Sequence, residues 1–334
     1  MRIAVCGVVL LLIGACFLIA CAGGTGTRPQ IQTGPVVATQ VTCPTSGLPG
    51  TSCFSLDISC PNIPNYTAYV KMITPANPVG TVIFGTGGAG TDLYETSASA
   101  PVAIKNVFDA NYEVVELTFG APFSSAPGWQ HDANGLGVRS AACRYAMVVQ
   151  WLAQQTPSVP LCATGNSAGG ALIGEGLAHY GIGQYLSFAE ITSGPPFTQV
   201  DQACSPDVPQ PGEYCSGADI GMSVGVSDAT NYIDPAYPGP WCSQGVLGST
   251  QNQQQFQNDS ITSNDAVLSY PKTKINFLFG GLDGSSAIRQ GLYYQSRITS
   301  PTSFGCVQDA PHDIPQVPDG AQTIAVDLIA NCHK

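Results

Sequence analysis

Charged side chains are scarce in this 334-residue sequence, and basic ones are the scarcest. Only 10% of the residues are charged, and 22 acidic residues stand against 11 basic ones, which gives a net charge of −11. Because an acidic chain repels phosphate backbones, no nucleic-acid partner is expected. With so few charges, the surface must consist mainly of Ser, Thr, Asn, Gln, Gly and Pro, a composition that we associate with exported proteins.

Residues suited to metal binding are also few. The sequence has four histidines, and none of its 13 cysteines belongs to a C-x-x-C pair. Structural zinc sites usually combine such pairs with histidines. No metal site is therefore expected.

Only one long hydrophobic run is present, and it begins directly after Met1 and Arg2. A short basic start before an apolar core is typical of a secretory signal. The run ends in "LIAC", which resembles a bacterial lipobox, so we expect residues 1–21 to be a signal sequence and Cys21 to be lipidated. A plainly cleaved signal is one alternative. An uncleaved anchor is another, since a membrane helix needs about 18 apolar residues. Membrane contact is expected only through this segment.

The cysteines beyond this signal are even in number. Once the three cysteines of residues 1–21 are set aside, ten remain, and an even set in an exported chain predicts disulfide bonds. Among the possible pairs, we predict Cys306 with Cys332 and Cys204 with Cys215. The protein is thus expected outside the cytoplasm, as a bacterial membrane-anchored lipoprotein or a secreted protein.

Strand and helix patterns alternate along most of the chain. This alternation, with apolar strands, predicts an α/β fold in which helices cover both faces of a mainly parallel sheet. Residues 22–50 lack a hydrophobic period and predict a flexible tether, so the domain is expected over residues 51–334. Residues 193–264 interrupt the alternation. They are too many for a structureless loop, so they predict an inserted cap or lid.

A glycine-rich stretch, "GTGGAG", follows a predicted strand at residues 81–84. It matches G-x-G-x-x-G, the dinucleotide-binding fingerprint. The next predicted strand carries Glu113 and Glu116, in the region where such a site needs an acidic residue. The stretch alone therefore allows a dinucleotide-dependent oxidoreductase. It equally allows an oxyanion site, because both need a bare backbone that aims N–H groups at negative charge.

The central motif is "GNSAG" at residues 165–169, which matches G-x-S-x-G. A predicted strand at 159–163 precedes it and a predicted helix from Ala171 follows it, the context of a nucleophile elbow. The turn is so tight that glycines are needed on either side of the serine. Ser167 is therefore the candidate nucleophile, held at the positive end of the helix.

A serine nucleophile needs a base and an orienting carboxylate, which follow it in the order acid, then histidine, on a framework of this kind. His312 lies in a loop after a predicted strand and is the candidate base. Asp283 lies just past another strand and is the candidate acid. His131 is the rival base, although it precedes the serine, and Glu190 and Asp201 are rival acids.

Together these residues resemble the α/β-hydrolase superfamily over residues 60–334. "SAGG" after the elbow resembles hormone-sensitive-lipase-like esterases, although the D-P motif of that group is absent. "FGTGG" resembles the H-G-x-G-G stretch of secreted esterases and polyester depolymerases, with Phe84 in place of the usual histidine. In those families the stretch supplies one oxyanion-hole N–H. Carried over, the donors are Thr86 or Gly87 together with Ala168. No subfamily is assigned.

The resemblance implies acyl transfer to water. We expect an exported serine hydrolase that cleaves small or polymeric carboxylic esters through an acyl-enzyme intermediate, with no cofactor. Trp129 and Trp241 lie in predicted loops and are candidate substrate-binding residues. The alternatives are a serine peptidase or amidase on the same fold, or a non-catalytic binding protein on a hydrolase scaffold. The sequence does not indicate an oligomeric state.

Overall fold

A computed structural model describes the chain between residues 34 and 333, apart from residues 46, 124–126, 213–214 and 250–251. The predicted signal sequence with Cys21, and the first part of the predicted tether, lie outside the described residues. Among the helices that are described, none is both long and apolar enough to cross a bilayer.

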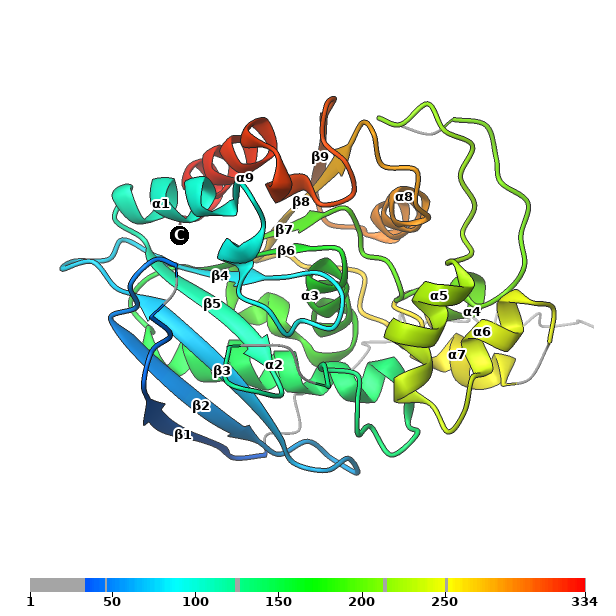
Figure 1. Ribbon diagram of the computed structural model, residues 1–334, viewed down its shortest axis with the longest axis horizontal. Helices are drawn as coiled ribbons and strands as arrows, with labels where there is room; N and C mark the ends of the chain where they lie inside the picture. Colours follow the sequence, from blue (N-terminus) through cyan, green and yellow to red (C-terminus); the bar gives the residue numbers. More distant parts are fainter. Residues whose placement is uncertain (1–33, 46, 124–126, 213–214, 250–251, 334) are drawn as a thin grey trace, which may run out of the picture.

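A nine-stranded sheet runs through the molecule (Figure 1) in the order β1-β2-β3-β5-β4-β6-β7-β8-β9. The pairs β1–β2, β2–β3 and β3–β5 are antiparallel, and all pairs from β5 across to β9 are parallel. The strands are β1 Val36–Val41, β2 Ser52–Ile58, β3 Tyr66–Ile73, β4 Thr81–Gly85, β5 Glu113–Phe119, β6 Leu161–Asn166, β7 Leu186–Thr192, β8 Lys274–Gly280 and β9 Thr302–Val307.

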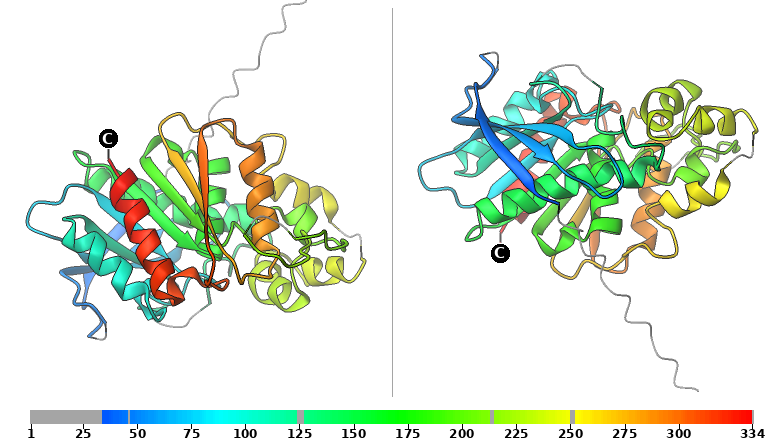
Figure 2. Two further views of the ribbon diagram at one scale, coloured as in Figure 1. Left: turned by 90° about the horizontal axis from the view of Figure 1, so that it is seen from above. Right: turned by 90° about the horizontal axis from the view of Figure 1, so that it is seen from below.

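The central strands are buried on both faces. Every residue of β4, β5 and β6 is buried, as expected for parallel strands that helices cover from both sides. Figure 2 shows α1 and α9 over one face of the sheet and α2 and α3 over the other. The predicted α/β fold with a mainly parallel sheet is confirmed.

Two apolar clusters correspond to these two faces. On the first face, α1 packs on β5 and α9 packs on β6 and β7, in an apolar cluster that includes Val82 of β4. On the second face, α2, α3 and α8 contribute to a larger cluster. The helices are α1 Ala100–Asp109, α2 Gly137–Gln155, α3 Ala168–Tyr180, α4 Val200–Ala203, α5 Val226–Asp228, α6 Trp241–Val246, α7 Gln253–Asp259, α8 Ala287–Arg297 and α9 Pro318–Asn331, with 3₁₀ helices η1 Tyr94–Thr96, η2 Ile182–Gln184, η4 Asp234–Ala236 and η5 Ile314–Gln316, and a π-helix η3 Ala229–Ile233.

The predicted tether over residues 22–50 is wrong for its second half. Val36–Val41 forms the edge strand β1, which pairs along β2, and a disulfide joins Cys43 to Cys53 of β2. The hydrophobic pattern does not predict this strand because its four middle residues are exposed. Its β-branched residues and its pairing with β2 make it a strand without much burial.

Residues 193–264 hold the short helices α4 to α7, which group together at one side of the molecule (Figure 1). This segment is attached to α8 by hydrogen bonds. The Gln199 side chain donates to the Gln290 carbonyl over 2.7 Å, and Gln290 in turn donates to the Met222 carbonyl over 2.8 Å. The short helices therefore form a packed layer rather than a loose loop.

All ten cysteines among the described residues form disulfide bonds. The pairs are Cys43–Cys53, Cys60–Cys143, Cys162–Cys332, Cys204–Cys242 and Cys215–Cys306. The predicted pairs Cys306–Cys332 and Cys204–Cys215 are wrong, because nearness in sequence does not decide which cysteines meet. The end of α9 brings Cys332 to β6, and the segment around Cys215 crosses to β9. Five disulfides are typical of proteins that fold in an oxidising compartment.

Candidate active site

Ser167 occupies the sharp turn between β6 and α3. Its backbone has φ 53° and ψ −117°, and this positive φ costs a residue other than glycine some free energy. The Ser167 N–H donates to the Thr192 carbonyl of β7 over 2.8 Å, which helps to hold this turn. A Cβ atom on Gly165 would lie 2.4 Å from the Gly169 carbonyl carbon. The turn is therefore possible only with glycine at this position.

The structure brings Ser167, His312 and Asp283 together. Ser167 Oγ lies 2.8 Å from His312 Nε2, and His312 Nδ1 lies 2.9 Å from Asp283 Oδ2. Ser167 follows β6, Asp283 follows β8 and His312 follows β9. The three side chains therefore converge at the carboxyl edge of the parallel strands, where sites in open α/β sheets form.

The hydrogen bonds determine which nitrogen of His312 carries the proton. An ionised carboxylate only accepts hydrogen bonds, so Nδ1 must donate to Asp283. In the neutral ring Nε2 is then unprotonated, and it accepts from the Ser167 hydroxyl. This is the tautomer that a general base needs.

The environment lowers the pKa of Asp283 and raises the pKa of His312. Burial alone raises the pKa of the Asp283 carboxyl, but hydrogen bonds from His312 and Ser285, together with the imidazolium charge, outweigh it and leave the pKa below its usual range. Burial lowers the pKa of His312, but the hydrogen bond and charge of Asp283, with the charges of Asp313 and Asp228, raise it above 6.5. Asp283 therefore stays ionised beside the imidazole.

The glycine-rich stretch lies beside the serine. A Cβ atom on Gly87 would lie 3.1 Å from Ser167 Cβ and 3.7 Å from its Oγ, and one on Gly169 would lie 2.5 Å from the Gly85 carbonyl oxygen. The Gly90 N–H closes a tight turn on the Gly87 carbonyl. The first turn of α3 and the loop after β4 are therefore in backbone contact.

The same stretch does not have the geometry of a dinucleotide site. In that motif the glycines open directly into a helix whose N-terminus binds the pyrophosphate, whereas here α1 begins only at Ala100. The two acidic candidates are also engaged elsewhere. Glu116 forms a buried ion pair with Lys71 over 3.0 Å, and Glu113 accepts hydrogen bonds from Thr74 and Thr81.

No family model and no curated protein matches this sequence. Solved structures do match. The chain is similar to a puromycin hydrolase, with a TM-score of 0.52 and 13% identity over 82% of this chain and 37% of that chain. It is also similar to alpha/beta hydrolase domain-containing protein 10 from mouse, with a TM-score of 0.50 and 11% identity over 82% of this chain and 96% of that chain. The chain has the α/β-hydrolase fold.

A cavity of about 480 Å³ opens over Ser167 in this α/β-hydrolase fold. The loop after β4, η1, the segment before α4, α5, η3 and the loops around Asp283 and His312 all contribute to it. Its lining residues are Thr86, Gly87, Gly88, Asp92, Tyr94, Thr96, Ser97, Asn166, Ser167, Pro196, Phe197, Asp228, Tyr232, Ser285, Ser286, Ala287, His312, Asp313 and Pro315. None of these is Lys or Arg.

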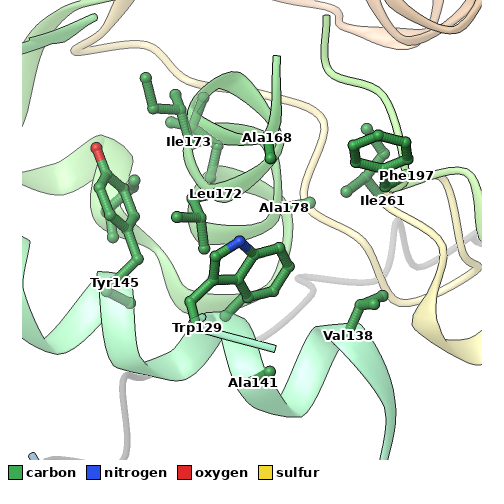
Figure 3. Close-up of a cluster of buried hydrophobic side chains, with 14 of the residues drawn as sticks. Trp129, Val138, Ala141, Tyr145, Ala168, Leu172, Ile173, Ala178, Phe197 and Ile261 are labelled. Atoms are coloured by element: carbon green, nitrogen blue, oxygen red, sulfur yellow. The ribbon is translucent and has the colours of Figure 1, made fainter. Parts of the chain in front are cut away.

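The two tryptophans predicted to bind substrate do not reach this cavity. Trp129 is 1% exposed, and Figure 3 shows it among buried side chains of α2 and α3. Trp241 begins α6 and packs against Tyr237, with ring centroids 5.8 Å apart. The aromatic wall is instead formed by Phe197 and Tyr232, whose centroids lie 5.5 Å apart. No hydrophobic period marks these two residues, since both lie in the irregular 193–264 segment.

The rival base and acids also lie elsewhere. His131 does not line the cavity, and its carbonyl accepts a hydrogen bond from Arg144. Glu190 is fully buried within the sheet, where it accepts from Thr164 over 3.2 Å. Asp201 belongs to α4 and is not among the lining residues either. Asp283 is the carboxylate that contacts His312 Nδ1.

Proposed function

We propose that this chain is an exported serine hydrolase that cleaves carboxylic esters. The observation that carries the proposal is the hydrogen-bonded chain from Asp283 through His312 to Ser167, which ends at the floor of an open cavity. A neutral imidazole with Nε2 unprotonated beside a serine hydroxyl is the arrangement that activates a serine as nucleophile.

In the proposed reaction, Ser167 Oγ attacks the ester carbonyl while His312 Nε2 takes the hydroxyl proton. The tetrahedral intermediate collapses, the proton passes from His312 to the departing alkoxide, and an acyl-enzyme ester remains on Ser167. Water then attacks this ester, again giving its proton to His312, and the carboxylic acid leaves as Ser167 regains the proton. Asp283 holds the imidazole in place and stabilises its charged form.

The oxyanion would be held by two backbone N–H groups. Ala168 is the first residue of α3, so its N–H has no carbonyl partner within the helix. The second donor is Thr86 or Gly87 in the loop that touches α3. Donors of this kind stabilise charge that develops only in the transition state.

Replacing Gly169 with alanine is expected to lower kcat about 100-fold, comparable to the loss of one oxyanion donor. The added Cβ would lie 2.5 Å from the Gly85 oxygen and 2.8 Å from the Thr86 oxygen, so the loop after β4 must move away from Ser167. Steady-state kinetics with a p-nitrophenyl ester measure the effect. The control is Gly217→Ala, where an added Cβ meets nothing within 4 Å. An unchanged kcat in the Gly169 variant would show that this contact does not position the loop.

The charges around the cavity favour neutral esters. Asp92, Asp228 and Asp313 line it, with no Lys or Arg among the lining residues. We expect p-nitrophenyl hemisuccinate, whose acyl group is anionic, to have about a tenfold lower kcat/KM than p-nitrophenyl butyrate at low salt, because charge pairs at cavity distances repel by several tenths of a kcal/mol each. Added salt should narrow the gap.

A charge-removing variant sharpens this comparison. Asp313→Asn should reduce the preference for the neutral ester, whereas Asp57→Asn should not, because Asp57 is exposed on β2, away from the lining residues. Equal turnover of both esters at low salt would contradict the proposed selectivity. It would leave ester cleavage itself intact.

Turnover of p-nitrophenyl esters and labelling by a fluorophosphonate probe test the proposed function. Cleavage of p-nitroanilides with no cleavage of the matching esters would indicate an amidase or peptidase. Absence of both turnover and labelling would indicate a binding protein.

The five disulfides support an exported protein. We further propose that residues 193–264 form the cap of the cavity, and that lipidation at Cys21 anchors the chain.

A further inference from the structure

Ser285 contacts both members of the Asp283–His312 pair. Its Oγ lies 3.1 Å from His312 Nδ1, and its backbone N–H donates to Asp283 Oδ1 over 2.8 Å. The residue lies in the short loop between β8 and α8, two positions after Asp283, and it lines the cavity. The sequence motifs of the site do not include it.

The chemistry of the three groups determines the direction of these bonds. His312 Nδ1 carries a proton because Asp283 can only accept, so Ser285 Oγ must accept from Nδ1 as well. The Ala287 N–H at the start of α8 also donates to Ser285 Oγ, over 3.3 Å. Both lone pairs of the hydroxyl are then occupied, and its own proton is left to donate. That proton can go to Asp283, which also receives a side-chain hydrogen bond from Ser285, so the oxygen faces Nδ1 as an acceptor.

We propose that Ser285 is a positioning residue for His312: it is a second acceptor for the Nδ1 proton and holds the ring in the tautomer and orientation that present Nε2 to Ser167. This inference rests on the proposed function. Ser285 would act through His312 and Asp283 without touching the reacting carbon. Because α8 donates to the same oxygen, the hydroxyl also connects the imidazole to a helix, which limits rotation of the ring.

The first test is Ser285→Ala. We expect kcat to fall about five- to tenfold, the loss that one neutral hydrogen bond can account for, with a smaller change in KM, because the Ser285 hydroxyl bonds to His312 Nδ1. Ser285→Thr keeps the hydroxyl and should recover at least half of wild-type kcat. The control is Ser296→Ala near the end of α8, whose hydroxyl donates to the local Tyr293 carbonyl. Thermal unfolding of each variant checks that the fold is retained.

The pH profile separates a positioning role from a purely structural one. The charged groups that face His312 are Asp283 from the loop after β8, Asp313 from its own loop and Asp228 from α5, and all three remain in the Ser285→Ala variant. Hydrogen bonds from a charged donor are stronger than those from a neutral one, so loss of the acceptor should move the acid limb of kcat/KM to lower pH by a few tenths of a unit. A structural role would leave the limb in place.

A second background tests the acceptor role directly. In Asp283→Ala, Ser285 would be the remaining acceptor near Nδ1 among the described residues, so adding Ser285→Ala should cost a larger factor in kcat there than in the wild type. A wild-type kcat and acid limb in the Ser285→Ala variant would overturn the inference, as would equal factors in both backgrounds. If the wild type neither cleaves esters nor reacts with a fluorophosphonate, the proposed function fails instead.

Discussion

Replacing Ser167 with alanine is expected to remove ester turnover almost completely, with kcat falling by about 10⁵-fold or more, as when a nucleophile that acts in concert with its base is deleted. The alanine variant keeps the cavity and the backbone donors, so substrate should still bind. What it lacks is the oxygen that lies 2.8 Å from His312 Nε2. The measurements are kcat for a p-nitrophenyl ester and the mass gained on treatment with a fluorophosphonate.

The same variant decides between the competing interpretations of the site. Because Ser167 is only 6% exposed, its substitution changes little of the surface, and the control is Ser296→Ala at the far end of α8. Labelling of the wild type at Ser167, with none in the alanine variant, would identify the nucleophile. Undiminished turnover in Ser167→Ala would contradict the proposed mechanism.

The arrangement of Ser167, Asp283 and His312 could be predicted because each residue lies shortly after a predicted strand. β6, β8 and β9 are neighbours or near neighbours in the sheet, and the carboxyl ends of parallel strands meet at one edge. Local patterns therefore fixed the positions of residues that are far apart in the chain. The predicted strand before the elbow was only shifted, since β6 begins at Leu161 and continues to Asn166.

The walls of the cavity could not be predicted in this way. Phe197 and Tyr232 lie in a segment of short helices without periodicity, and their position depends on how that segment packs on α8. The same limit applies to the disulfides, because each pairing depends on the complete fold. Edge strand β1 was missed for a different reason: its four middle residues, which alternate between the two faces of the strand, are all exposed, so it buries too little to produce a hydrophobic pattern.

The glycine-rich stretch shows how one pattern can serve two chemistries. G-x-G-x-x-G predicts a stretch of backbone that glycines leave accessible. It does not predict which group lies against that backbone. Here Gly169 packs on Gly85 and Gly87 packs on Ser167, so the glycines allow a loop to lie against the elbow. Phe84, the last residue but one of β4, is fully buried and packs on Tyr94 of η1 with centroids 5.1 Å apart. That contact helps to hold the loop after β4 in place.

Asp283→Asn is expected to lower kcat by about 10³- to 10⁴-fold and to change the pH dependence of what remains. An asparagine has nearly the same shape, but its amide carries no charge and can donate to Nδ1, which would favour the wrong tautomer of His312. In the wild type, the base form of His312 prevails only above a pKa that Asp283 and the nearby carboxylates raise beyond 6.5. Activity should therefore rise with pH through an acid limb above 6.5.

The direction of the shift in the variant follows from the causes of that pKa. Burial lowers the pKa of His312, and Asp283 provides the largest opposing effects through its hydrogen bond and charge. Without that charge the effect of burial dominates and the pKa of His312 falls. The acid limb of Asp283→Asn should therefore lie at lower pH than in the wild type. Asp228→Asn removes a smaller effect and should shift the limb less in the same direction, while Asp57→Asn should not shift it. A limb that stays in place in Asp283→Asn, or a loss of kcat below tenfold, would show that another group orients and charges His312.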